Sequence, residues 1–219
     1  MVSHSISGQR LWLSPQRCVF WEDESALILS DLHFGKTGHF RKSGIAVPQS
    51  VYREDLQRLV ALIQHFQPKK LFIAGDMFHS RLNQEFELFK KWRDDLSLID
   101  IHLIMGNHDI LHENWYREAS ITVHAKILQN APFQFCHNPV DCSSDALTPS
   151  YYSFTGHVHP GITIYGMGRQ SLRFPCFHFT ESYCVLPAFS RFTGTYRIAP
   201  SEKDIVYAIV NEDLVSVHC

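Results

Sequence analysis

Residues 101–109 read IHLIMGNHD, and this stretch decides the fold of the chain. The mostly aliphatic run at 101–105, followed by Gly106, predicts a buried strand that ends in a tight turn. Asn107, His108 and Asp109 then project from the carboxyl end of that strand, where open α/β sheets usually place their ligands. Asn offers a neutral oxygen to a metal, His can donate a proton to a leaving group, and Asp can orient the His. Taken alone, the turn could equally be a polar strand end without chemistry.

Two earlier apolar runs end in the same way. Residues 26–29 (ALIL) precede Asp31 and His33, and residues 70–74 (KLFIA) precede Asp76. Amphipathic spacing predicts helices over 49–66 and 83–97, which lie between these strands in the chain. Strand, helix, strand, helix, strand indicates βαβ units and a parallel sheet. A helix cap at Ser30 or Asp31 is the alternative interpretation of the first polar turn.

The second half of the chain changes character after about residue 119. Short β-type runs replace the helical periodicity, and we expect strands over 121–128, 132–136, 151–155, 161–165, 176–180, 183–186 and 204–210. Two of these runs end in turns that carry His137 and the pair His157 and His159. The sequence therefore predicts an α/β protein in which a second sheet packs against the first and helices cover the sandwich.

Composition and length limit the class of protein. With 219 residues and no break in composition, we expect one domain over 1–219. The formal net charge of -2 gives no overall attraction to nucleic acid or anionic lipid, so a phosphate-bearing substrate must be bound locally. We see neither a membrane-length apolar run nor a signal sequence, and we expect a cytoplasmic protein without membrane contact. The six cysteines form no C-x-x-C pair, which predicts reduced thiols in that compartment.

Several side chains at the strand ends have the chemistry of metal ligands. They are Asp31, His33, Asp76, Asn107, His137, His157 and His159. Mixed oxygen and nitrogen donors suit Mn, Fe or Zn better than Ca. Because these ligands exceed the needs of one four-coordinate ion, we expect two metal ions that share a carboxylate. No cysteine stands among them, which argues against a structural zinc site.

In this order the residues resemble the calcineurin-like metallophosphoesterase family, whose pattern is D-x-H, G-D, G-N-H-[DE], a lone His, and G-H-x-H. Here the pattern reads Asp31-Leu32-His33, Gly75-Asp76, Gly106-Asn107-His108-Asp109, His137, and Gly156-His157-Val158-His159. The resemblance implies the metallophosphoesterase sandwich, a four-layer α/β fold (α+β type) in which helices flank two packed mixed sheets.

A narrower resemblance is to the bacterial ligase-associated DNA-damage-response endonuclease group PdeM. It is carried by LHFGKTGHFRKSGIAVP at 32–48, LRFPCF at 172–177, LPAF at 186–189 and FTG at 192–194. Ser190-Arg191 departs from the smaller, glycine-containing turn that this resemblance leads us to expect.

The family resemblance also implies a role for each site residue. Asp31, His33, Asp76 and His159 would hold one metal ion, and Asp76, Asn107, His137 and His157 the other, with Asp76 bridging. Two divalent ions about 3.5–4 Å apart, Mn²⁺ foremost and Fe or Zn as alternatives, would clamp a phosphate and lower the pKa of a bound water toward about 7. The resulting hydroxide would attack phosphorus in line. His108 would protonate the leaving oxygen as general acid, and Asp109 would orient His108 and favour its cationic form.

The substrate follows less directly from the residues. The loop at 34–44 carries Lys36, His39, Arg41 and Lys42, which suit the phosphates of a nucleic acid, although such a loop could also be merely solvated. We expect Asn107 to contact substrate as well. The PdeM resemblance implies a phosphodiesterase or endonuclease that acts on DNA in repair, beside a DNA ligase and a helicase.

Two alternatives stay open at this stage. One is a phosphomonoesterase or nucleotide hydrolase of the same family. The other is a catalytically inactive scaffold with the same fold, against which the complete ligand set and the presence of His108 argue.

Overall fold

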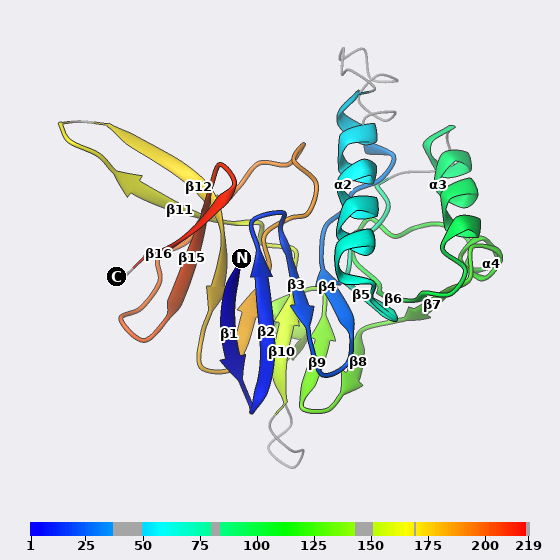
Figure 1. Cartoon of the computed structure of the whole chain (residues 1–219), viewed down its shortest axis with the longest axis horizontal. Coiled ribbons are helices and arrows are strands. Elements are labelled where there is room, and N and C mark those ends of the chain that lie inside the picture. The colour runs from blue at the N-terminus through cyan, green and yellow to red at the C-terminus, as the bar shows by residue number, and fades with distance from the viewer. Residues whose placement is uncertain (37–49, 80–83, 143–150, 169, 218–219) are drawn as a thin grey trace.

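The computed structural model describes residues 1–36, 50–79, 84–142, 151–168 and 170–217 (Figure 1). Two β-sheets pack face to face, and helices cover one outer side of the pair (Figure 1). Within the described residues, no helix combines the length and the apolar composition that crossing a bilayer requires.

The first sheet contains seven strands in sequence order. They are β1 (Val2–Ile6), β2 (Gln9–Ser14), β3 (Cys18–Trp21), β4 (Ala26–Leu29), β5 (Lys70–Ala74), β6 (Asp100–Ile104) and β7 (Ile121–His124). Neighbours from β1 to β4 are antiparallel, and neighbours from β4 to β7 are parallel. The sheet is therefore mixed, and its parallel part consists of the three strands predicted before the polar turns together with β7.

The second sheet contains nine strands and is also mixed. Its strands are β8 (Ile127–Asn130), β9 (Phe133–Cys136), β10 (Tyr152–Thr155), β11 (Pro160–Tyr165), β12 (Ser171–Phe179), β13 (Tyr183–Val185), β14 (Tyr196–Arg197), β15 (Ile205–Val210) and β16 (Asp213–Val217). Strand β10 lies between β9 and β13 and is parallel to both. The prediction of two packed mixed sheets is thus confirmed.

The described helices are α2 (Ser50–Phe66), α3 (Gln84–Asp95), α4 (Glu113–Glu118) and the 3₁₀ helix η1 (Pro139–Cys142). Leu59 and Ile63 of α2, Phe89 of α3 and Trp115 of α4 pack with alternate residues of the first sheet, such as Leu27. These helices therefore cover the outer face of the first sheet.

The opposite face of the first sheet forms the core between the sheets. Successive strand residues point to opposite faces, so Ile28 and Phe72 join Phe135 and Phe154 of the second sheet while Leu27 faces the helices. Phe72 and Phe135 stack at 4.5 Å between ring centroids. Burial on both faces explains why these strands are continuous apolar runs rather than alternating ones.

Two features of the fold differ from the sequence prediction. The single strand expected over 121–128 is two strands, because the chain leaves the first sheet after His124 and enters the second at Ile127. Strands β1, β2 and β3 were not predicted. Neither were β14 and β16, since Tyr196–Arg197 is very short and Asp213–Val217 is largely exposed.

Candidate metal centre

The site lies where the two sheets meet at the carboxyl ends of their parallel strands. Asp31 and His33 follow β4, Asp76 follows β5, and His108 follows β6. His137 follows β9 of the second sheet, and the pair His157 and His159 follows β10. The structure therefore brings together strand ends that are more than a hundred residues apart in the chain.

The predicted ligands form two overlapping clusters. Asp31, His33 and His159 form the first, and Asp31, Asp76 and His137 the second; in each, the candidate ligand atoms lie within 4.8 Å of one another. Asp31 Oδ1 lies 3.2 Å from His159 Nε2, and Asp76 Oδ2 lies 3.5 Å from His137 Nε2. Asp31 belongs to both clusters, whereas the sequence predicted Asp76 as the shared ligand. Bridging by Asp76 stays a prediction.

The backbone is strained at these ligands. Asp31, His33, Asp76, His157 and His159 all have φ between 49° and 67°, in the left-handed region that L-residues other than Asn and Asp seldom adopt. Such conformations cost about 1–3 kcal/mol each and concentrate at functional sites.

Two motif glycines leave room for the ligands. A Cβ on Gly75 would collide with the ring of His137, and a Cβ on Gly106 would collide with the carboxylate and the backbone nitrogen of Asp76. Any side chain at either position would displace a ligand. The glycines of G-D and G-N-H-D are therefore required by packing at the site.

Burial and charge fit the residues to divalent cations. Asp31 and Asp76 are buried, with oxygens within 4.8 Å, so two negative charges face each other away from water. Burial acts to raise the pKa of Asp31, but the hydrogen bond and charge of His159, with His137 and His33, hold it below its ordinary value. Burial lowers the pKa of His33 to about 2, which keeps its ring neutral and able to bind a metal.

Unpaired nitrogens give a second sign of the same fit. His33 Nδ1 is buried without a hydrogen-bond partner in the described part of the chain. His33 Nε2 faces His159 Nε2 at 3.4 Å, and His157 Nδ1 faces His137 Nε2 at 3.1 Å. Neighbouring acceptor nitrogens, two buried carboxylates and an unpaired ring nitrogen together form a donor set suited to Mn, Fe or Zn.

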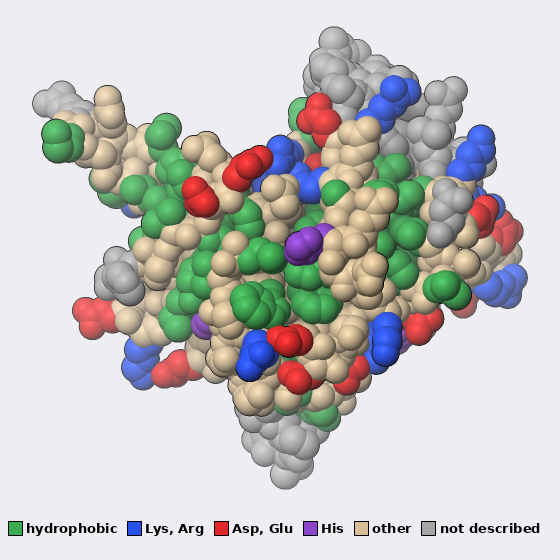
Figure 2. Space-filling model, viewed as in Figure 1, with side chains coloured by type: hydrophobic (Ala, Val, Ile, Leu, Met, Phe, Trp, Pro, Cys, Tyr) green, Lys and Arg blue, Asp and Glu red, His purple; other side chains and the backbone are tan. Residues whose placement is uncertain are grey.

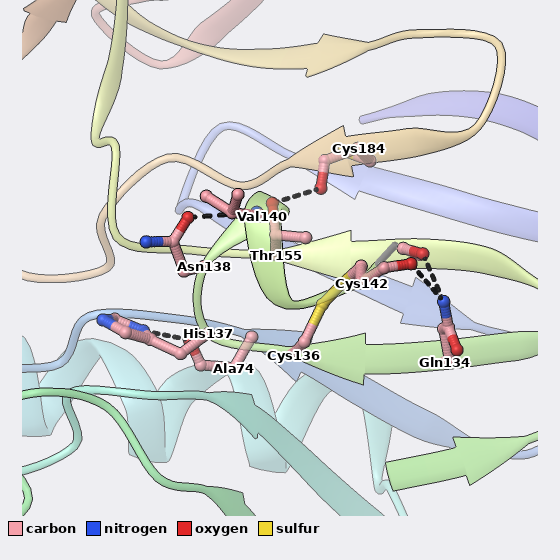
Figure 3. The surroundings of a disulfide bond; sticks show 10 residues. Ala74, Gln134, Cys136, His137, Asn138, Val140, Cys142, Thr155 and Cys184 are labelled. Carbon is pink, nitrogen blue, oxygen red and sulfur yellow. Dashed lines mark hydrogen bonds between the residues drawn. A yellow bond between two sulfur atoms is a disulfide. The ribbon is translucent and has the colours of Figure 1, made fainter. Parts of the chain in front are cut away.

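Backbone contacts orient two of the imidazoles. His137 Nδ1 lies 3.0 Å from Ala74 O, so it donates to this carbonyl and leaves Nε2 for a metal (Figure 3). His157 N donates to Asp31 Oδ2 at 3.1 Å, which ties the second sheet to the first. Asn107 is exposed in its turn, and its role as a ligand and substrate contact stays a prediction.

His108 lies beside the clusters and is partly open to solvent. Its backbone N donates to Asp76 Oδ1 at 2.9 Å, and its Nε2 lies 4.0 Å from Asp76 Oδ2. The side chain is 46% exposed, so a leaving group can reach it. This geometry is compatible with a general acid.

Asp109 accepts hydrogen bonds from backbone amides, and its role of orienting His108 stays a prediction. Its carboxylate accepts hydrogen bonds from Phe78 N and Gly106 N, both at 2.9 Å, and within the described residues none comes from the His108 ring. The side chain is buried, and burial raises its pKa to about 7. Asp109 turns inward because the polar turn needs an acceptor for these buried amides, and it thereby joins the segment after β5 to the turn after β6.

The ring of His79 packs against the ring of His108. His79 was not identified from the sequence. The two ring centroids are 4.2 Å apart with an interplanar angle of 34°, and the ring of His33 lies 5.2 Å from that of His79. His79 stands three residues after Asp76 of the G-D motif. This short spacing is the signal that could have identified His79 as a site residue.

The predicted substrate-binding residues are only partly described. The charges of Asp31 and Asp76 act on the Lys36 ammonium, although burial outweighs them and lowers the pKa of Lys36. His39, Arg41 and Lys42 lie outside the described residues.

The prediction of reduced thiols is wrong for one pair of cysteines. A disulfide joins Cys136, at the end of β9, to Cys142 in η1, and closes the turn that carries His137 (Figure 3). The 3₁₀ helix folds the chain back, so that the two Cα atoms lie 6.1 Å apart, within disulfide range. Cys18, Cys176 and Cys184 are buried.

Comparisons with known proteins show which family and which solved structures the chain resembles. The family described as calcineurin-like phosphoesterase matches residues 25–185. The crystal structure of the Pseudomonas putida nuclease MPE superposes with a TM-score of 0.79 at 28% identity, covering 95% of this chain and 96% of that one. The phosphoesterase Yfce of E. coli gives a TM-score of 0.45 at 12% identity, covering 88% and 98%. Among curated protein sequences, none matches the chain significantly.

Proposed function

The chain belongs to the calcineurin-like phosphoesterase family, and from that premise we propose that it is a phosphodiesterase which cleaves DNA with two divalent metal ions. One observation carries the proposal, namely the overlapping clusters of buried Asp and His ligands at the edge where the two sheets meet. The phosphoesterase family supports the hydrolytic chemistry. The likeness to a nuclease over almost the whole of both chains supports a polynucleotide substrate.

The metal ions would be held by the two clusters, with His157 and Asn107 completing the second. When bound, two such ions neutralise phosphate charge and lower the pKa of a coordinated water toward about 7. We propose Mn²⁺ foremost, with Fe or Zn as alternatives, because mixed carboxylate, imidazole and amide donors suit these ions.

The protein's own side chains do the remaining work. Asp76 Oδ1 accepts a hydrogen bond of 2.9 Å from the backbone N of His108, and the His79 ring packs on one face of the His108 imidazole. His108 donates a proton from its ring to the departing oxygen, which would otherwise leave as an unstable alkoxide. Lys36, near both carboxylates, balances their negative charge when the phosphate approaches.

The biological assignment follows from the same resemblance. We propose endonucleolytic cleavage in DNA repair, in the cytoplasm and beside a DNA ligase and a helicase, with residues 1–219 acting as one domain. A single domain agrees with the ligands, since both sheets contribute to one site.

The test uses circular DNA, which has no ends for an exonuclease. Metal-stripped protein receives Mn²⁺ and single-stranded or double-stranded circles, and linear products are followed on gels. We expect Mn²⁺-dependent linearisation, and none with Asp76→Asn, which keeps the shape of the side chain but removes its charge. Hydrolysis of nucleotide monoesters without cutting of either circle would contradict a nuclease and favour a small-molecule phosphatase.

A further inference from the structure

Arg191 lies in the turn where a smaller residue was expected, next to residues that contact the segment carrying Asp31. The preceding residues hydrogen-bond to the segment that carries the ligand Asp31: Phe189 N donates to Ser30 O at 2.8 Å, and Ser190 N donates to Asp31 O at 3.1 Å. Arg191 therefore follows directly on a segment that borders the first metal cluster.

Two further arginines converge on this turn. Arg17 Nη1 donates to Ala188 O at 3.0 Å and to Ser190 O at 2.8 Å. Arg58 donates to Phe189 O and lies over the Phe189 ring at 4.1 Å. Both side chains thus hold the turn in place, and this structural role accounts for them.

The side chain of Arg191 has no such structural role. It is exposed, and its Nη2 donates to the neutral side-chain oxygen of Gln16 at 3.2 Å. Its backbone N donates to Asp55 Oδ1 at 3.3 Å, while the Asp55 carboxylate pairs with Arg58 at 2.9 Å. The guanidinium of Arg191 is therefore available to an anion.

The cluster has more positive than negative charge. Burial, with the charges of neighbouring guanidiniums, lowers the pKa of Arg17 and of Arg58 to about 10. Arg58 Nε is buried and lacks a hydrogen-bond partner in the described part of the chain. Arg58 pairs with Asp55, while Arg17 and Arg191 line a cavity with one carboxylate, that of Glu212, which leaves one positive charge in excess.

A cavity opens at this cluster. Its volume is about 300 Å³, and it is lined by Arg17 and Arg191, by Asn211 and Glu212, and by Pro15 and Pro175. Figure 2 shows basic side chains gathered between the β15–β16 hairpin and α2, with acidic side chains on the hairpin side. The volume is sufficient for a phosphate group with its attached sugar.

We propose that this cavity, the arginine pocket, binds a phosphate group of the polynucleotide next to the one that is cleaved. The inference rests on the proposed function. Guanidinium groups match phosphate oxygens in a two-pronged geometry, and phosphate contacts of this kind position a nucleic acid without reading its sequence. With a net charge of -2 the chain depends on such local contacts.

The test variant is Arg191→Gln, which removes the charge from an exposed side chain and leaves the backbone contact to Asp55. Arg117→Gln is the matched control: Arg117 is also exposed, donates from Nη2 to the neutral Asn114 Oδ1 at 2.9 Å, and lies on α4 at the far edge of the molecule (Figure 1). Each protein is assayed with Mn²⁺ on a single-stranded oligonucleotide and on bis(4-nitrophenyl) phosphate, which has no flanking phosphate.

We expect Arg191→Gln to raise the ratio of KM for the oligonucleotide to KM for the small diester by roughly 10-fold or more, the scale of a hydrogen bond to a charged group. The dependence of log KM on log salt concentration should weaken by about 0.7, the value for one phosphate contact to a single strand. Arg117→Gln should match the wild type in the KM ratio and in the salt dependence of KM. Arg191→Lys should keep the wild-type salt dependence because it keeps the charge.

A free phosphate ion has the same chemistry as the flanking group. Inorganic phosphate is therefore titrated against metal-stripped protein, with thermal stability as the readout. If phosphate stabilises wild type but not Arg191→Gln while the KM ratio is unchanged, the pocket takes the free ion, and the flanking-phosphate assignment is wrong.

The experiment distinguishes failure of the arginine pocket from failure of the proposed function. If wild type hydrolyses both substrates and Arg191→Gln behaves like Arg117→Gln, the arginine pocket is refuted and the proposed function stands. If wild type hydrolyses neither substrate with any divalent metal, the proposed function is refuted, and the pocket with it.

Discussion

Gly106→Ala tests the close packing of the metal centre with the smallest possible change. Gly106 does not have the positive φ of a strained glycine, so alanine suits its backbone and the effect isolates the added methyl group. That methyl group would overlap both the carboxylate and the backbone nitrogen of Asp76. Because backbone cannot swing away as a side-chain tip can, Asp76 must move as a unit.

The expected magnitude follows from the overlap. Overpacking of a filled site costs about 1–3 kcal/mol, and at about 2–4 °C per kcal/mol for a chain of this size Tm should fall by roughly 2–12 °C. The loss of metal binding should add to this. Mn²⁺ at about 100 times its Kd stabilises the wild type by about 2.7 kcal/mol, or roughly 5–11 °C, and the variant should lose most of that gain.

The assay is thermal unfolding of metal-stripped protein with and without Mn²⁺, together with the number of ions bound per chain. Gly194→Ala is the control, since a Cβ there meets no atom within 4 Å. If Gly106→Ala binds two ions and gains the same Tm from Mn²⁺ as Gly194→Ala, then the close approach of Gly106 does not hold Asp76 in place, and the packing argument is refuted.

Two further predictions concern the proposed general acid and the hydrogen-bonded carboxylate of Asp204, just before β15. His108→Ala should retain both metal ions but slow turnover of a diester with an alkyl leaving group by about 10²–10⁴-fold. The loss of rate should be much smaller when the leaving group is nitrophenolate, which departs without a proton. An equal loss of rate on the two diesters would exclude leaving-group protonation by His108. Asp204→Asn should lower Tm at neutral pH, because hydrogen bonds from His178 Nε2 at 2.8 Å and Ser201 N at 3.0 Å outweigh burial and hold the pKa of Asp204 below 3.8. A carboxyl whose pKa is lowered in the folded protein stabilises the fold at pH values above its unfolded pKa and loses that effect in acid. The difference in Tm should therefore shrink below pH 3.8. A constant difference at all pH values would contradict the stabilising hydrogen bonds to Asp204.

The parallel part of the first sheet was predictable because its signal is local. Residues 70–74 were expected as a strand and form β5 (Lys70–Ala74), and the helix expected over 49–66 is α2 (Ser50–Phe66). Strands buried on both faces are unbroken apolar runs, and the polar turns that follow them are short. The clustering of Asp31, His33, Asp76, His137 and His159 followed from placing these turns at one edge of the sandwich.

The remaining features depend on contacts that no local pattern encodes. Strand β10 pairs with β13 rather than with the β11 that follows it, and such non-local parallel pairing leaves no trace in residue spacing. The sequence placed Asp109 next to His108 but could not show that its carboxylate turns toward Phe78 N. Arg17 and Arg191 are 174 positions apart, so their common cavity exists only in the folded chain.

The central claim is that the clustered Asp and His side chains form a two-metal phosphodiesterase site. The most direct test is hydrolysis of bis(4-nitrophenyl) phosphate and 4-nitrophenyl phosphate by metal-stripped protein, with Mn²⁺ added back and bound metal counted. We expect no turnover without metal and, with two ions bound per chain, turnover that favours the diester. Preference for the monoester would assign the site to a phosphatase, and a protein that binds two ions but hydrolyses neither ester would contradict the claim.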